Sequence, residues 1–227
     1  MEQENQLGTA CEVGVVGLGN WGTALANYLA LRGHAVLGWS RNAAVVQSIT
    51  SERRHAEFLT DVPLSPHFHA TTEIAEVLRA PVLILALPAE SLASIGTLLP
   101  STTTQLLVSA IKGFEDRSCT TPLQYLQKLL PQASFAVLSG PSFAKDIIRG
   151  RPAGIVAAAT REEDARKVVE LFSGGALRVY LSDDPVGVEI GGAVKNVIAL
   201  AVGVCDGLAL GDSARAGLIT RGLAEMT

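Results

Sequence analysis

The chain has 227 residues, of which 48% are hydrophobic and 18% are charged, and its formal net charge is −4. This length suffices for one large domain, or for one domain and part of another. The acidic balance disfavours a nucleic-acid partner, because binding a phosphate backbone requires an excess of Lys and Arg. The three cysteines form no CxxC or Cys/His pattern, so we expect neither a disulfide framework nor a metal site.

Two segments bear on the location of the protein. The polar and acidic segment 1–10 lacks the charged-then-apolar order of a signal peptide. The most apolar stretch, 186–210, is interrupted by Glu189, Lys195 and Asp206, which favours a buried helix over a membrane span. Without an export signal or a span, the expected location is the cytoplasm.

Short apolar runs alternate with amphipathic stretches as far as residue 181. The apolar runs predict buried strands at 11–17, 35–39, 82–87, 105–110, 133–139, 153–159 and 177–181. Helical patterns are predicted between them at 20–32, 72–79, 122–130 and 161–172. Buried strands that alternate with helices are typical of an α/β fold with a Rossmann-like, doubly wound, mostly parallel sheet.

The pattern changes near residue 182. Asp183 or Asp184 followed by Pro185 predicts the start of a helix, with a capping carboxylate and proline in the first turn. Only helical patterns follow, to about residue 205 and again over 213–226. We therefore predict an α/β domain over 1–181 and the N-terminal part of a helical domain over 182–227. The second part is too short to bury a core alone, so either a partner subunit covers it or the domain continues.

Gly17, Gly19 and Gly22 form a GxGxxG pattern between the first predicted strand and the first predicted helix. In a dinucleotide-binding turn the first glycine permits the tight turn and the second lets a pyrophosphate approach the backbone. The third allows close packing of the helix on the sheet. The helix N-terminus adds N–H donors and a partial positive charge. The motif predicts NAD(H) or NADP(H) as the cofactor.

The end of the second predicted strand bears on the choice between the two dinucleotides. An NAD-selective site presents Asp or Glu about 20 residues after the glycine turn, whereas this chain has Ser40 and Arg41. Arg41 could face a 2′-phosphate and Ser40 could hydrogen-bond to it; the other interpretation of Arg41 is an ordinary surface charge. The sequence therefore favours NADP(H).

Two further segments follow predicted strands and could contact a substrate. Lys112 lies at the predicted carboxyl edge of the sheet, where doubly wound sheets bind ligands. Gly140 and Ser142 lie in a strand–turn–helix segment, in which Ser142 could cap the helix and free N–H groups could hold an anion. A solvated lysine and an ordinary capped helix are the alternative interpretations.

Lys195 lies in an otherwise apolar helix beside small residues, and Asn196 follows it. Burial would lower the pKa of this lysine and would let it exchange a proton near neutral pH. The alternative is a lysine whose charged end extends out of a packed helix. Asn196 adds a neutral hydrogen-bond donor.

Taken together, these segments resemble the bacterial, cytoplasmic NAD(P)-dependent glycerol-3-phosphate dehydrogenases over essentially the whole chain. The matching stretches are 17–26, 112–113, 140–144, 187–190, 195–199, 207–212 and 221–226. The Lys-Asn helix and the segment 221–226 are far more specific to this family than the glycine turn is.

The resemblance implies reversible hydride transfer between NAD(P)H and dihydroxyacetone phosphate, giving sn-glycerol 3-phosphate for glycerophospholipid synthesis. It implies that Lys195 donates and accepts the proton, with Lys112 and Asn196 also in the catalytic centre. The implied substrate contacts are Lys112, Gly140, Ser142 and Lys195. The implied cofactor contacts are Gly17, Gly19, Asn20, Trp21, Gly22, Arg41, Lys112 and Ala144. The resemblance also implies that the helical domain continues past residue 227. A homodimer is the assembly that we expect.

Two other interpretations are open at this point. Another reductase with a Rossmann domain and a helical second domain, such as a 3-hydroxyacid dehydrogenase or a ketopantoate reductase, shares the glycine turn and the lysine. The segments 140–144 and 221–226 disfavour it. A dinucleotide-binding module without catalysis is the second alternative.

Overall fold

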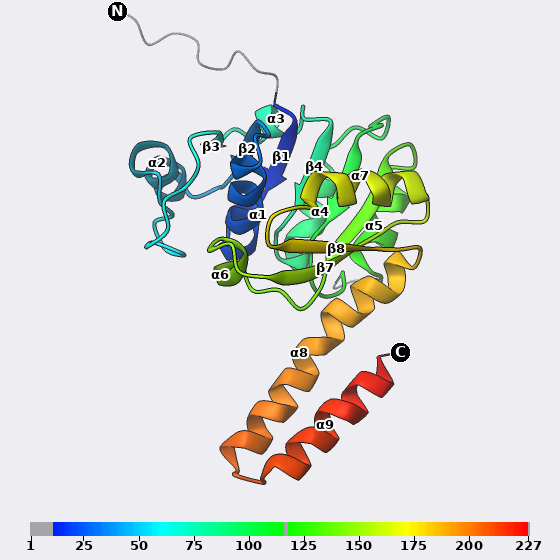
Figure 1. The fold of residues 1–227 in the computed structure, drawn as a ribbon. Helices are drawn as coiled ribbons and strands as arrows, with labels where there is room; N and C mark the ends of the chain where they lie inside the picture. Colours follow the sequence, from blue (N-terminus) through cyan, green and yellow to red (C-terminus); the bar gives the residue numbers. More distant parts are fainter. Residues whose placement is uncertain (1–10, 116–117, 227) are drawn as a thin grey trace, which may run out of the picture.

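The computed structural model describes residues 11–115 and 118–226. In this part of the chain, eight strands form one sheet in the order β3-β2-β1-β4-β5-β6-β7-β8 (Figure 1). The strands are β1 (Val13–Val16), β2 (Val36–Trp39), β3 (Phe68–Thr71), β4 (Val82–Leu85), β5 (Leu106–Ser109), β6 (Ser134–Ser139), β7 (Ala153–Ala158) and β8 (Leu177–Ser182). All neighbouring strands run parallel except β6 and β7. The predicted mostly parallel, Rossmann-like sheet is confirmed.

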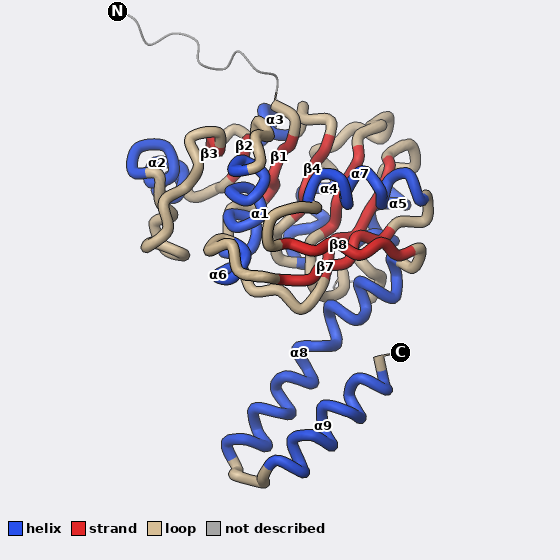
Figure 2. Tube along the Cα trace, viewed as in Figure 1, coloured by secondary structure: helices blue, strands red, loops and turns tan. Residues whose placement is uncertain are grey.

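Helices cover both faces of the sheet (Figure 2). They are α1 (Asn20–Leu31), α2 (Ala43–Gln47), α3 (Ile74–Val77), α4 (Leu92–Gly96), α5 (Pro122–Leu129), α6 (Ala144–Ile147), α7 (Glu162–Phe172), α8 (Pro185–Gly207) and α9 (Asp212–Glu225), with single turns η1 (Ser48–Glu52) and η2 (Ala89–Ser91). One core cluster joins α1, α6 and α7 to the sheet, and the other joins α3, α4 and α5 to it. The alternation within β1 shows why two layers form, since Val15 enters the first cluster and Val16 the second.

The structure adds elements that the sequence pattern did not reveal. β3 is an edge strand in which only Phe68 is buried, so it has no continuous apolar run. The helices α2 and α4 have five residues each, which is too few for a helical periodicity to be recognised. The four-residue α6 begins at Ala144, where the strand–turn–helix segment predicted a helix start. The sequence therefore predicted the buried strands and the long amphipathic helices. It did not predict the edge strand or the short helices α2 and α4.

The last two helices leave the sheet as an antiparallel pair (Figure 1). Asp184 is the cap of α8, because its Oδ1 accepts a hydrogen bond from Gly187 N at 2.8 Å. α9 packs closely against α8 at Gly222, where a Cβ would lie 2.7 Å from Ile198. Much of this pair faces solvent, and Leu200 of α8 is 72% exposed.

By length and composition, α8 is able to span a membrane. Its most apolar window has a mean hydropathy of 1.6, and 17% of that window is buried. Core helices of soluble proteins meet the same criteria. The first turns of α8 pack on the sheet domain, where Glu189 and Gly192 are buried against β5, β6 and α5. The rest of α8 is mostly exposed, so the prediction of a buried helix over 186–210 is wrong for most of its length.

Candidate active site

The site lies at the carboxyl ends of the parallel strands, which form one edge of the sheet. β1, β4, β5 and β6 are consecutive parallel neighbours, so their carboxyl ends meet at that edge. The glycine turn follows β1, Lys112 follows β5 and Gly140 follows β6. The sheet therefore brings these three segments to the same edge, as doubly wound folds do with their ligand sites.

Glycine is present at the three positions of the turn for different structural reasons. Gly17 has a φ of +103°, and a Cβ there would lie 2.5 Å from Ala86 O. A Cβ on Gly22 would overlap the carbonyl oxygen of Gly17, so only glycine lets α1 begin this close to the turn. Gly19 is different, because its φ is −78° and nothing lies within 4 Å of its Cβ position. The backbone at Gly19 is thus open to a ligand rather than packed against protein.

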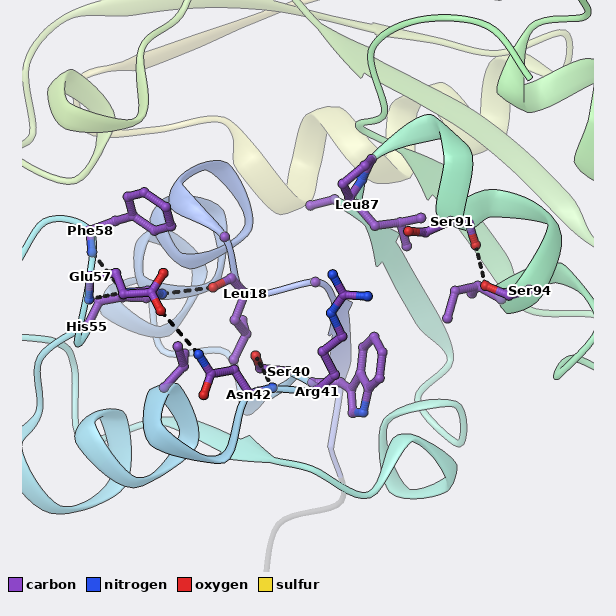
Figure 3. Close-up of a pocket in the computed structure, with 17 residues that line it drawn as sticks. Leu18, Ser40, Arg41, Asn42, His55, Glu57, Phe58, Leu87, Ser91 and Ser94 are labelled. Carbon is purple, nitrogen blue, oxygen red and sulfur yellow. Dashed lines mark hydrogen bonds between the residues drawn. The ribbon is translucent and has the colours of Figure 1, made fainter. Parts of the chain in front are cut away.

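A cleft of about 370 Å³ opens beside this turn (Figure 3). Gly17 and Gly19 line one part of it, and Arg41 lies in its middle. Arg41 is exposed and has no ion pair with any residue in the described part of the chain. Ser40 Oγ accepts a hydrogen bond from Asn42 N at 3.2 Å. A free guanidinium at the end of β2 fits an anionic group of a ligand in the cleft.

His55 is a cleft residue that sequence reasoning missed. It is 1% exposed, and its Nε2 donates a hydrogen bond to Leu18 O at 2.8 Å. Its Nδ1 accepts hydrogen bonds from the backbone N atoms of Glu57 and Phe58, both at 3.0 Å. These partners require the neutral tautomer with hydrogen on Nε2. His55 therefore ties the cleft-lining segment 55–58 to the glycine turn, and no periodicity in the sequence marks it.

Lys195 connects α8 to the edge of the sheet. Its Nζ donates a hydrogen bond to Gly140 O at 2.6 Å. Burial and the positive charge of Lys112 lower the pKa of Lys195 to about 8. The direction agrees with what an apolar helix predicts for a lysine. A lysine with this pKa exchanges its proton at a pH close to neutral.

Lys112 lies near both the first turn of α1 and Lys195. Its Nζ is 5.7 Å from the centre of the Trp21 ring, and Trp21 is in the first turn of α1, directly after the glycine turn. Trp21 Nε1 is buried without a hydrogen-bond partner among the described residues. The open backbone at Gly19, the free Arg41 and this unpartnered N–H fit a bound dinucleotide.

The turn after β6 corrects one prediction. α6 begins after Phe143 with no side-chain cap, so Ser142 does not cap it. Ser142 Oγ is instead buried, with no partner in the part of the chain that the structure describes. A buried hydroxyl without a partner costs free energy unless a ligand or water satisfies it. Gly140 and Lys195 line a second cavity of about 360 Å³ with Gly191 and Gly192.

Seven of the predicted site residues line neither cavity: Asn20, Trp21, Gly22, Lys112, Ser142, Ala144 and Asn196. Asn20 and Asn196 are exposed, and Ala144 is buried in the core at the start of α6. Within residues 11–115 and 118–226, no three His, Cys, Asp or Glu side chains come together as metal ligands.

Replacing Gly19 with Ala tests the dinucleotide part of the site. The methyl group would enter open space, so we expect the free energy of unfolding to change by less than about 0.5 kcal/mol. The same methyl group would occupy the approach of a pyrophosphate, so the Kd for NADPH should rise at least about tenfold. Urea unfolding and a fluorescence titration measure the two quantities. Gly203→Ala, in equally open space on α8, is the control and should leave the Kd unchanged. Normal NADPH binding by Gly19→Ala would contradict the assignment.

Comparison with known proteins identifies the family of this chain. Models of the N-terminal and C-terminal parts of the NAD-dependent glycerol-3-phosphate dehydrogenases match residues 12–165 and 184–227. A glycerol-3-phosphate dehydrogenase (NAD(P)+) of Paramagnetospirillum magneticum is 44% identical over 218 residues, which are 95% of this chain and 79% of that relative. The corresponding protein of Novosphingobium aromaticivorans is 45% identical over 217 residues, which are 95% of this chain and 65% of the relative.

A solved structure shows the same relationship. The crystal structure of glycerol-3-phosphate dehydrogenase from Coxiella burnetii matches this chain with a TM-score of 0.86 and 32% identity, covering 94% of this chain and 66% of that one. This chain thus spans about two thirds of the length of that protein and of the second relative. From the family models and the identity to these relatives, the chain belongs to the NAD-dependent glycerol-3-phosphate dehydrogenase family.

Proposed function

We propose that the protein catalyses the reversible NAD(P)H-dependent reduction of dihydroxyacetone phosphate to sn-glycerol 3-phosphate. The observation that carries this proposal is the placement of Lys195, with its lowered pKa, on Gly140 O beside Lys112. Membership of the family and the names of the relatives support the substrate. The product would supply glycerophospholipid synthesis.

The two lysines perform the acid–base part of the proposed reaction. When bound, the reduced nicotinamide supplies a hydride to the C2 carbonyl carbon of the substrate. Lys112 and Lys195 stabilise the negative charge that develops on the carbonyl oxygen, and Lys195 donates a proton to it. In the reverse direction Lys195 accepts the proton of the C2 hydroxyl. Asn196 is assigned to the catalytic centre as a neutral donor from its position in the family's Lys-Asn motif, although its side chain is exposed in this structure.

The proposed substrate and cofactor contacts combine residues that line the two cavities with residues that match the family's motifs. Gly140 and Ser142 are assigned to the substrate, because the buried Ser142 Oγ lacks a partner among the described residues and Gly140 lines the cavity with Lys195. The residues assigned to the cofactor are Gly17, Gly19, Asn20, Trp21, Gly22, Arg41, Lys112 and Ala144. The open backbone at Gly19 supports the pyrophosphate position, and the free guanidinium of Arg41 supports NADP(H).

The domain division, the assembly and the location are part of the same proposal. We assign 1–181 to the dinucleotide domain and 182–227 to the beginning of the helical domain, which the separate family models support. We also propose a homodimer in the cytoplasm. The exposed apolar side chains of α8, such as Leu200 and Val204, are a surface that a second subunit or further helices would cover.

Lys195→Ala tests the proton-transfer role. Because the variant lacks the acid and base, we expect kcat/KM for dihydroxyacetone phosphate to fall by about 10²- to 10⁴-fold, with an unchanged Kd for NADPH. The measurement is the loss of reduced-nicotinamide absorbance, and Lys128→Ala, at an exposed site on α5, is the control. Turnover unaffected by Lys195→Ala would refute the role. NADPH binding without any turnover by the unsubstituted chain would favour a cofactor-binding module instead.

The pH dependence of the two directions should be opposite. Lys195 must be protonated to act as the acid in reduction and neutral to act as the base in oxidation. Because its pKa is about 8, kcat for reduction should fall as the pH rises through about 8, and kcat for oxidation should rise over the same range. In Lys112→Ala the neighbouring positive charge is gone, so the pKa of Lys195 and both midpoints should move upward. Unmoved midpoints in that variant would argue against the coupling.

Arg41→Ala tests the choice of dinucleotide. A charge-assisted hydrogen bond to a 2′-phosphate contributes about 1.5–3 kcal/mol, so the Kd for NADPH should rise roughly tenfold or more. The Kd for NADH should change by less than about twofold, since NADH lacks this phosphate. Fluorescence titration of both cofactors gives the ratio. An equal loss for both, or a wild-type preference for NADH, would overturn the assignment of Arg41.

A further inference from the structure

Glu189 is a buried carboxylate that the proposed reaction does not use. It lies on α8, six residues before Lys195, and is 3% exposed. Burial raises the pKa of Glu189. A helix that only needed to cover a sheet would place an apolar side chain here, because a buried carboxylate is costly unless it is fully hydrogen-bonded.

The partners of Glu189 are all hydrogen-bond donors. Oε1 accepts from Ser109 Oγ at 3.0 Å, and both carboxylate oxygens lie 3.2 Å from Leu123 N in the first turn of α5. The Thr121 hydroxyl also donates to the carboxylate, while its oxygen accepts from Gln124 N as the cap of α5. The carboxylate thus closes the N-terminus of α5, where free N–H groups carry a partial positive charge.

These contacts connect the two elements that carry the lysines of the site. Ser109 is the last residue of β5, and Lys112 follows it three positions later. Through the hydrogen bond between Glu189 and Ser109, the helix that carries Lys195 is therefore linked to the strand that leads to Lys112. The hydrogen bonds of this carboxylate restrict sliding and rotation of its helix, because the carboxylate oxygens must stay within hydrogen-bond distance of fixed donors.

α8 has a second close contact with the sheet at Gly192, which lies between Glu189 and Lys195 in the sequence. A Cβ on Gly192 would lie 2.6 Å from Ser139 Oγ, so the backbone of α8 passes very close to the end of β6. One turn later, Lys195 Nζ reaches Gly140 O in the turn that β6 leads into. The helix is thus held at Glu189 and at Gly192 before the lysine reaches its acceptor.

We propose that Glu189 is a positioning residue, whose carboxylate sets the register of α8 against β5 and α5 and so places Lys195 Nζ beside Gly140 O and Lys112. The catalytic meaning of this placement rests on the proposed function. The placement itself is a property of the folded chain, so it can be measured without turnover.

The test measures the apparent pKa of Lys195 by its rate of acetylation as a function of pH, read by mass spectrometry, with exposed Lys128 as the internal standard. Glu189→Ala should release Lys195 from its site, so its apparent pKa should rise by about one unit or more toward that of Lys128. Glu189→Gln retains one accepting oxygen and should give a smaller rise. The charged group acting on Lys195 is Lys112.

The direction of this shift separates displacement from direct electrostatics. Removing the negative charge of Glu189 would by itself lower the pKa of a nearby lysine, so an upward shift reports that Lys195 has moved. Asp184→Ala is the matched control, since it removes the cap of the same helix without touching β5 or α5. It should leave the Lys195 profile unchanged.

Activity gives a second readout. In Glu189→Ala, kcat should fall at least about tenfold while the Kd for NADPH stays within about twofold, because the glycine turn is not touched. If Glu189→Ala does not fold, Ser109→Ala and Glu189→Gln must show the upward shift. An unchanged Lys195 profile in folded variants would overturn the positioning role. A shifted profile in a chain that does not reduce dihydroxyacetone phosphate would support the positioning role and refute the proposed function.

Discussion

The hydrogen bond from Lys195 Nζ to Gly140 O joins the two parts of this chain at the place where chemistry is proposed. It brings a cation from an otherwise apolar helix onto the carboxyl edge of a parallel sheet, close to the second cation Lys112. Burial lowers the pKa of Lys195, and the neighbouring positive charge of Lys112 lowers it further.

The edge itself results from chain direction. Four neighbouring strands run parallel, so the glycine turn, Lys112 and Gly140 follow strands that end on the same side. The glycines make the first of these turns tight enough for α1 to begin immediately, and Gly19 leaves its backbone uncovered. Lys112 Nζ then lies 5.7 Å from the centre of the Trp21 ring and lowers the pKa of Lys195 by its positive charge. The buried Glu189 links β5, α5 and α8 behind this arrangement.

The parts of the fold that were predictable were those with a strong local signal. Buried strands have continuous apolar runs, and α1, α5 and α7 have enough turns for a periodicity to appear. The edge strand β3 and the short helices α2 and α4 have neither. The mistaken prediction that Ser142 is a helix cap has the same origin. A serine before a helix suits a cap locally, but the chain here turns so that α6 begins one residue later. The buried hydroxyl then has no hydrogen-bond partner among the described residues.

The sequence by itself determined the class of the sheet, the dinucleotide turn and the resemblance to a dehydrogenase family, because these depend on residue types at short spacing. Only the tertiary structure decided which distant residues meet. His55 on Leu18 O, Lys112 near Trp21, and Glu189 on Ser109 are contacts between segments far apart in the chain. Burial and hydrogen bonding between such segments depend on how strands and helices pack, and no spacing along the sequence encodes them.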